Sequence, residues 1–179
     1  MDRMRRLAWL GFLAVAALLL AGCPPRMDDH QKLVKDGNDY FDTGNYRRAI
    51  EAFTKALELK PGEPGVLVNR ANARMMLGDT QGALADYDEA VRLDPKFALA
   101  YANRGILKDR MGDAEGAIQD YRKALELDPS LGDPPGILKR VLYNVPDETI
   151  KDRLEYLEAV QAARRSAQGH SPASRGATE

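Results

Sequence analysis

The one cysteine of this chain, Cys23, carries its most reactive side chain and ends an apolar run that reads LLLAGC. A single thiol cannot close a disulfide within the chain. It cannot build a thiolate metal site either, because such sites need several Cys or His ligands and only His30 and His170 are available. The chemistry left to Cys23 is that of a small buried hydrophobe, an interchain disulfide or a point of covalent modification.

The residues before Cys23 favour covalent modification. Arg3, Arg5 and Arg6 precede an uncharged run over 7–23, which is the pattern of an export signal. A transmembrane anchor is the alternative, although the run is shorter than the ~18–20 apolar residues that cross a bilayer comfortably. The ending LAGC resembles the lipobox of bacterial lipoprotein precursors, in which signal peptidase II cuts before the cysteine.

This resemblance implies that residues 1–22 are a signal peptide and that Cys23 begins the mature chain, carrying diacylglycerol and an acyl group. Two or three acyl chains anchor stably, because each buried methylene contributes about 0.8 kcal/mol. Pro24 stands where the inner-membrane retention signal of enteric bacteria has Asp. We therefore expect a cell-envelope protein, lipid-anchored at the periplasmic face of the outer membrane.

Residues 23–29 are then a lipidated stem. About five residues separate Cys23 from the first helical element, and at ~3.3 Å each they span at most ~17 Å. The folded part is therefore expected to lie close to the bilayer.

Charge and motif content exclude several classes of function. The 26 Lys and Arg are balanced by 27 Asp and Glu, with the two signs interspersed, whereas a surface that tracks phosphates needs an excess of cations. The sequence has no Gly-rich phosphate loop, nucleophile elbow or HExxH motif. We expect no enzyme, no metal, no cofactor beyond the acyl chains, no nucleic acid and no small-molecule substrate.

Residues of matching type recur every 34 positions between 30 and 131. The matching sets are Pro61, Pro95 and Pro129; Gly44, Gly78 and Gly112; Ala49, Ala83 and Ala117; Phe53, Tyr87 and Tyr121; and Ala56, Ala90 and Ala124. This period resembles the tetratricopeptide repeat (TPR) family, whose unit is a helix-turn-helix. The resemblance implies an all-α solenoid of three repeats, 30–63, 64–97 and 98–131.

Local chemistry supports the same helix pairs. A glycine ends the first helix of each unit, where a positive φ is tolerated. The residue after it, Asn45, Asp79 or Asp113, is predicted to cap the second helix with its side chain. The aromatic column at Phe53 and its equivalents is predicted to lie in the core, between small residues.

The 34-residue period ends after the third unit, and residues 132–165 are predicted to form capping helices. One apolar stripe lies within 136–143, and a second consists of Ile150, Leu154, Leu157 and Val160. Because a solenoid needs terminal elements with one polar face, the second helix is predicted to cover the third repeat. Docking into a partner or a second copy is the alternative. Residues 166–179 lack large apolar side chains and are predicted to be a disordered tail.

By resemblance, the first helices of the repeats line a concave groove that holds an extended peptide or a partner helix. The predicted groove residues are Lys35, Asn38, Asn69, Asn72, Met75, Asn103, Ile106 and Arg110. An Asn amide both donates and accepts, so it can pair with the backbone of a peptide at about 1 kcal/mol net per bond. The alternative is that these are solvated asparagines with structural bonds, and that Met75 or Met76 belongs to the core.

A narrower resemblance is to the carboxylate clamp of chaperone-binding TPR domains. Asn38 and Asn69 match the two asparagines of the clamp, but its basic positions fall on Val34, Leu99 and Asn103. Without cations a terminal carboxylate loses its charge-assisted bonds, so recognition of this type is disfavoured.

The sequence therefore predicts a lipid-anchored adaptor that binds a protein partner in its groove. Resemblance to TPR lipoproteins implies settings such as pilus or secretin assembly, outer-membrane protein assembly or recruitment of peptidoglycan hydrolases. The alternative is a structural lipoprotein that forms a homo-oligomer, with its groove filled by a second copy.

Overall fold

The computed structural model describes residues 28–133 and 149–169. Within these ranges the chain is all helical, as predicted, with seven α-helices, one short 3-10 helix and no strand. The elements are α2 (Asp29–Asp42), α3 (Tyr46–Leu59), α4 (Pro64–Met76), α5 (Thr80–Leu93), α6 (Ala98–Arg110), α7 (Ala114–Leu127), η1 (Pro129–Gly132) and α9 (Ile150–Gly169). The described residues do not include Cys23, the segment before it, the stripe predicted within 136–143, or His170.

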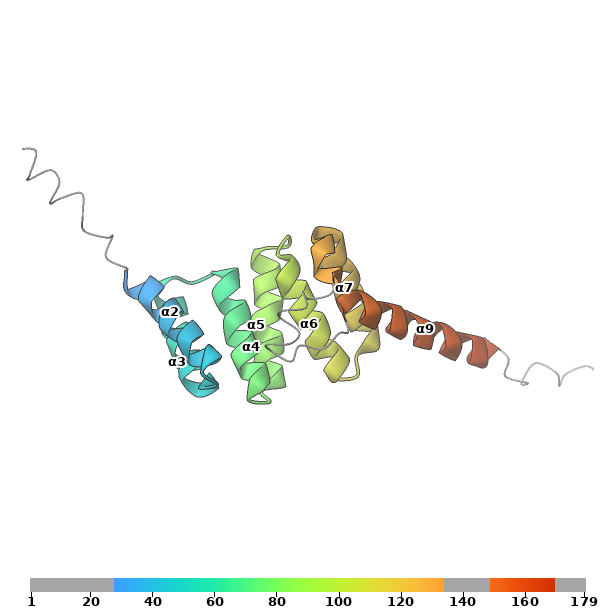
Figure 1. Ribbon diagram of the computed structural model, residues 1–179, viewed down its shortest axis with the longest axis horizontal. Coiled ribbons are helices and arrows are strands. Elements are labelled where there is room, and N and C mark those ends of the chain that lie inside the picture. The colour runs from blue at the N-terminus through green and yellow to red at the C-terminus, as the bar shows by residue number, and fades with distance from the viewer. Residues whose placement is uncertain (1–27, 134–148, 170–179) are drawn as a thin grey trace, which may run out of the picture.

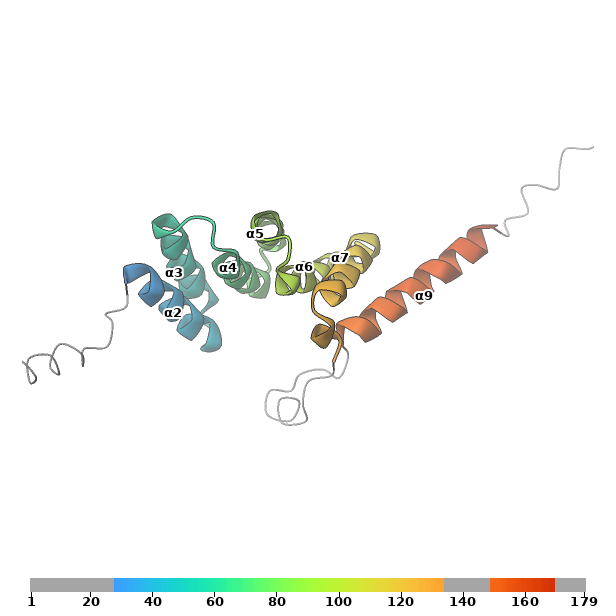
Figure 2. The same cartoon turned by 90° about the horizontal axis from the view of Figure 1, so that it is seen from above.

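The helices α2 to α7 form three consecutive pairs in a row (Figure 1). Each second helix also packs against the first helix of the next pair, so the row is continuous. Figure 2 shows the first helices α2, α4 and α6 along one side and the second helices α3, α5 and α7 along the other. The residues predicted for the groove therefore come from one side of the molecule.

The turn within each pair depends on a glycine with a left-handed backbone. Gly44, Gly78 and Gly112 have φ angles of 75°, 79° and 84°, a conformation that costs a residue with a Cβ free energy. These are the positions at which the sequence predicted helix ends.

The predicted side-chain caps form in two repeats and not in the first. Asp79 accepts a hydrogen bond from the Gly82 N–H at 3.0 Å, and Asp113 caps α7 in the same way. The Asn45 side chain makes no such bond. A Cβ at Gly82 would lie 2.2 Å from Asp79 Oδ2, and the equivalent position in the first repeat is Arg48. The two repeats that form this cap thus have a glycine three residues after the aspartate, whereas the first repeat has Arg48 at that position.

The aromatic column is buried where the sequence placed it, and glycines in the first helices make room for it. Phe53 is fully buried and Tyr121 almost so. A Cβ at Gly37 would lie 2.5 Å from the Phe53 ring, and one at Gly105 would lie 2.8 Å from the Tyr121 ring. Small residues here let the two helices of a pair approach closely.

Two aspartates are buried between the helices of the second and third repeats. Asp86, 5% exposed, accepts two hydrogen bonds from Arg70. Asp120, 3% exposed, accepts two from Arg104, and the Lys108 ammonium lies 2.8 Å from it. Bonding to Asp120 raises the pKa of the Arg104 guanidinium. These cations offset the free-energy cost of burying the carboxylates.

The helix α9 packs on the third repeat, as the capping prediction requires. Leu157 is buried in a cluster with Ile118 and Tyr121, and Ile150 and Leu154 pack against the same cluster. Its later half extends away from the row of helices (Figures 1 and 2).

The helix α9 runs to Gly169, so residues 166–169, which the sequence assigned to a disordered tail, are helical. The residues just before this segment favour its helical conformation, because Ala and Arg have high helix propensity. They are Ala162, Ala163, Arg164 and Arg165. A lack of large apolar side chains therefore does not end this helix. None of the helices in the two described ranges has both the length and the hydropathy of a membrane-spanning segment.

Candidate functional site

Four asparagines of the first helices form two hydrogen-bonded pairs between adjacent repeats. Asn69 Nδ2 donates to Asn38 Oδ1 at 3.1 Å, and Asn103 Nδ2 donates to Asn72 Oδ1 at 3.1 Å. The Tyr87 hydroxyl also donates to Asn72 Oδ1. The second pair lies 34 residues after the first, so the arrangement repeats with the helices.

Each pair leaves one side-chain nitrogen and one side-chain oxygen without a hydrogen bond. Among the described residues, the amide nitrogens of Asn38 and Asn72 make no hydrogen bond, and neither do the side-chain oxygens of Asn69 and Asn103. All four residues are partly exposed. A free N–H beside a free C=O matches the two groups that an extended peptide backbone presents.

The first pair borders a hollow of about 310 Å³, which we call the first pocket. It lies between α2, α3 and α4, and its lining is mostly polar. The lining residues are Asn38, Phe41, Asp42, Phe53, Asn69 and Asn72.

Another hollow, of about 190 Å³, lies in the third repeat, between α6, α7 and the start of α9. We call it the third pocket after that repeat. Four of its residues stand 68 positions, or two repeats, after residues of the first pocket: Ile106, Asp109, Arg110 and Tyr121. The others are Thr149, Ile150 and Arg153.

This correspondence gives α9 the position of a fourth first helix. Ile150 and Arg153 are three residues apart, as are Asn69 and Asn72, and they complete the third pocket as the asparagines complete the first. The Arg153 guanidinium makes two hydrogen bonds to Asp109 on α6. The groove therefore has four helices along it.

The remaining predicted groove residues have different surroundings. The Lys35 ammonium pairs with Asp39 on the same helix. Met75 packs against the core of the second repeat, whereas Met76 is 49% exposed. Ile106 and Arg110 line the third pocket, far along the row from Lys35.

The positions that would carry the cations of a carboxylate clamp have other contacts. Val34 packs against the core of the first repeat. Leu99 is exposed, and Asn103 is bonded to Asn72.

A polar contact that the sequence did not predict joins the start of α2 to the residue before α4. His30 is buried, and its Nε2 lies 3.2 Å from Glu63 Oε2. Asp28 pairs with Lys60 beside it, and the Gln31 backbone N–H and Lys60 lower the pKa of the Asp28 carboxyl. The 34-residue period could have predicted this contact, since a stack of such repeats places residue 30 beside residue 64.

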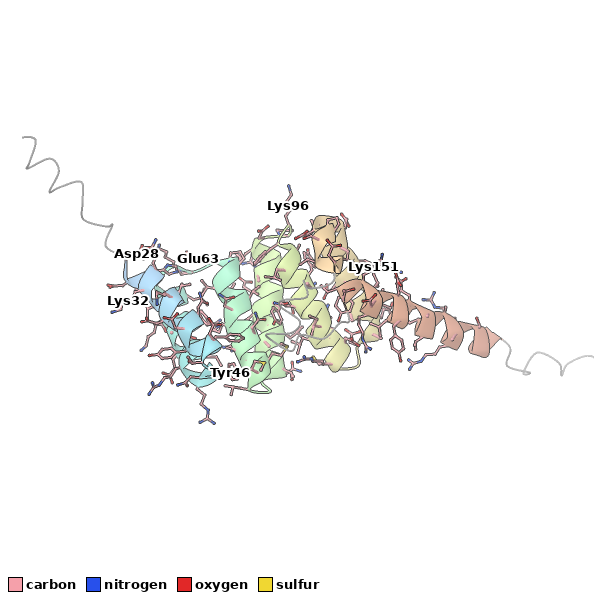
Figure 3. The ribbon with its side chains drawn as sticks, viewed as in Figure 1. Asp28, Lys32, Tyr46, Glu63, Lys96 and Lys151 are labelled. Atoms are coloured by element: carbon pink, nitrogen blue, oxygen red, sulfur yellow. The ribbon has the colours of Figure 1, made fainter. Side chains whose placement is uncertain are left out.

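Figure 3 labels Asp28 and Glu63 at the same end of the first helices. Within the part of the chain that the structure describes, no group of three or more His, Cys, Asp or Glu side chains could hold a metal ion. The His30 contact therefore links the start of α2 to the start of α4.

The family comparison agrees with this geometry. A model described as "Tetratricopeptide repeat" matches residues 35–98, and a second model with the same description matches residues 98–131. Together they cover more than half of the chain. The chain belongs to the tetratricopeptide repeat family.

Solved structures show the same fold. The first TPR domain of Spaghetti (RPAP3) bound to the HSP90 peptide SRMEEVD is 28% identical, with a TM-score of 0.61 over 75% of this chain and 94% of that one. The Sgt2 TPR domain from Aspergillus fumigatus is 27% identical, with a TM-score of 0.62 over 82% of this chain and 86% of that one.

A curated relative matches a shorter stretch. The outer dynein arm-docking complex subunit 4 of Danio rerio is 39% identical over 46 residues, which are 26% of this chain and 10% of that protein. The chain thus matches about a tenth of the length of that relative.

Proposed function

We propose that this protein is a membrane-anchored adaptor that holds an extended segment of a protein partner in the groove formed by α2, α4, α6 and α9. The observation that carries the proposal is the pair of asparagine contacts between repeats. Each pair offers one side-chain nitrogen and one side-chain oxygen that make no hydrogen bond, so the two pairs can bond a peptide backbone independently of its side chains. The similarity to a TPR domain bound to an HSP90 peptide supports a protein ligand.

The ligand is an internal segment of its protein and not a free C-terminus. Val34, Leu99 and Asn103 stand at the clamp positions, and none of them is a cation. A terminal carboxylate bound there would lose water without gaining charge-assisted hydrogen bonds. An internal segment makes no such demand, because its backbone carries no formal charge.

The anchor is the acylated thiol of Cys23, which LAGC and the preceding run support. Because α2 begins at Asp29, the start of α2 then lies within roughly 20 Å of the lipid surface. Partners embedded in the membrane, or assembling on it, are within reach. Pilus or secretin assembly, outer-membrane protein assembly and recruitment of peptidoglycan hydrolases are processes of this kind.

Anchoring is tested by replacing Cys23 with Ser in cells supplied with radiolabelled palmitate. The parent chain is expected to take up label and to sediment with membranes, and Cys23→Ser is expected to lose the label. A parent chain without label would overturn the anchor and leave the groove proposal standing.

Groove binding is tested by crosslinking in cells from a photoreactive residue at position 69 or 103. Ala85 is the control position, because it is exposed on α5 in the same row of helices but outside the groove. We expect one protein to be captured from 69 and 103 and not from 85. Equal capture from all three positions, or none from the groove, would contradict the proposal.

A further inference from the structure

Three residues at equivalent positions differ in charge along the groove. Asp42, Met76 and Arg110 are the last residues of α2, α4 and α6 and stand 34 positions apart. They present a carboxylate, a thioether and a guanidinium in order. We call this set the charge row.

The two charged members have no partner of their own. Among the described residues neither Asp42 nor Arg110 forms an ion pair or a side-chain hydrogen bond, and both are exposed. On the same helices Lys35 pairs with Asp39, and Asp109 pairs with Arg153.

The position of Asp42 also carries a cost. The C-terminal end of a helix has a partial negative charge, so a carboxylate there is disfavoured by a few tenths of a kcal/mol and a cation favoured. Arg110 follows this rule at the end of α6, and Asp42 violates it at the end of α2. The unfavourable carboxylate is explained if a cation from outside the chain meets it.

Both charges face the groove. Asp42 lines the first pocket beside Phe41, and Arg110 lines the third pocket beside Ile106. Burial raises the pKa of the Tyr87 phenol, and the charge of Arg110 acts on the same group in the opposite direction.

We propose that the charge row selects the ligand by its charge pattern: a basic side chain at the α2 end, an apolar one in the middle and an acidic one at the α6 end. This inference rests on the proposed groove function. In the first pocket the stem of a Lys or Arg would lie against the Phe41 ring while its head meets Asp42. The opposite charges at the two ends hold the ligand in one direction.

The spacing follows from the helices. The helix α4 contacts both α2 and α6, and neighbouring helices lie roughly 10 Å apart, so the two charges are about 20 Å apart. An extended peptide rises ~3.3 Å per residue, so the basic and acidic side chains are about six residues apart.

The test uses the full chain in detergent micelles to select from a library of displayed random twelve-residue peptides. The expected peptides carry Lys or Arg about six positions from Asp or Glu, in one consistent order. The double variant Asp42→Arg with Arg110→Asp is expected to select the reverse order. A swap of Glu89 and Arg92, an exposed ion pair on α5, is the matched control and should leave the order unchanged.

A selected peptide then gives the size of the effect. Exposed ion pairs contribute at most about 1 kcal/mol, so Asp42→Asn or Arg110→Gln is expected to weaken its binding about two- to fivefold. The loss should shrink as salt is raised. Helical circular dichroism equal to that of the parent would show that the variants fold.

The outcomes separate the two proposals. In one outcome the parent chain enriches peptides and the variants Asn69→Ala and Asn103→Ala do not, but the peptides show no charge order, or the swapped variant selects the same order as the parent. The charge row is then not a selector, and the groove function stands. If no peptide is enriched, or enrichment ignores the asparagines, the groove function fails and this inference fails with it.

Discussion

Asn69 donates its side-chain N–H to Oδ1 of Asn38 across the boundary between the first and second repeats. The bond leaves the nitrogen of Asn38 and the oxygen of Asn69 without a hydrogen bond, and both residues line the first pocket. Because the next pair repeats the arrangement one repeat later, two matched donor and acceptor sets lie in line. This geometry supports binding of a backbone, since only a backbone offers the same two groups at regular intervals.

Removing an asparagine should weaken the binding of a groove ligand. Asn69→Ala or Asn103→Ala is expected to reduce affinity about fivefold, because one hydrogen bond contributes about 1 kcal/mol net. Fluorescence anisotropy with a peptide selected on the full chain measures the change. Asn45→Ala is the control, since Asn45 is exposed and its side chain caps nothing. Equal losses in all three variants would contradict a groove-specific role.

Gly105 is predicted to tolerate no side chain. A Cβ there would lie 2.8 Å from the Tyr121 ring, and overpacking of this kind costs about 1–3 kcal/mol. Gly105→Ala should therefore lower the free energy of unfolding measured in urea. Gly65→Ala is the control, because no atom lies within 4 Å of the added Cβ, and it should be neutral or stabilising. A Gly105→Ala chain as stable as the parent would mean that the helices separate easily.

The buried carboxylate of Asp120 should matter more than an exposed one. Asp120→Ala would leave Arg104 and Lys108 without their shared partner, and breaking a buried pair in this way costs about 3–5 kcal/mol. Glu89→Ala breaks the exposed pair with Arg92 and should cost about 1 kcal/mol or less. Thermal unfolding of both variants compares them. Similar stabilities would show that the Asp120 network is a surface interaction.

Tyr87 should give the protein an alkaline limit of stability. Burial raises the pKa of its phenol, so above pH 10 the unfolded chain loses this proton while the folded chain keeps it. The unfolded state is then favoured, and stability falls as pH rises past 10. Tyr87→Phe should show a shallower fall between pH 9 and 11 in denaturant titrations.

The matched variant for Tyr87 is Tyr156→Phe, because Tyr156 is exposed on α9. It should retain the full alkaline fall. A Tyr87→Phe chain that follows the parent curve at high pH would rule out the phenol as the cause.

The 34-residue period was enough to predict the helix pairs, the glycine turns and the buried aromatic column. Each of these depends on residues close in sequence or on a type that repeats in register. The missing cap at Asn45 was not predictable from the residue type, because Asn is a favoured N-cap residue.

The role of α9 was harder to predict, since residues 150 and 153 do not follow the repeat pattern and residues 128–149 separate α9 from α7, whereas only residues 94–97 separate α5 from α6. Only the match between the third and first pockets shows that α9 stands where a fourth first helix would. The charges of Asp42 and Arg110 were visible in the sequence, but their lack of partners depends on contacts between helices.

The measurement closest to the central claim is a nuclear magnetic resonance titration. The full chain carries ¹⁵N-labelled asparagine, a selected peptide is added, and the side-chain amide signals are followed. We predict that the signals of Asn38 and Asn72, whose N–H groups are free, shift as the peptide is added, while that of Asn45 does not. Binding with no change at Asn38 and Asn72 would contradict backbone recognition in the groove.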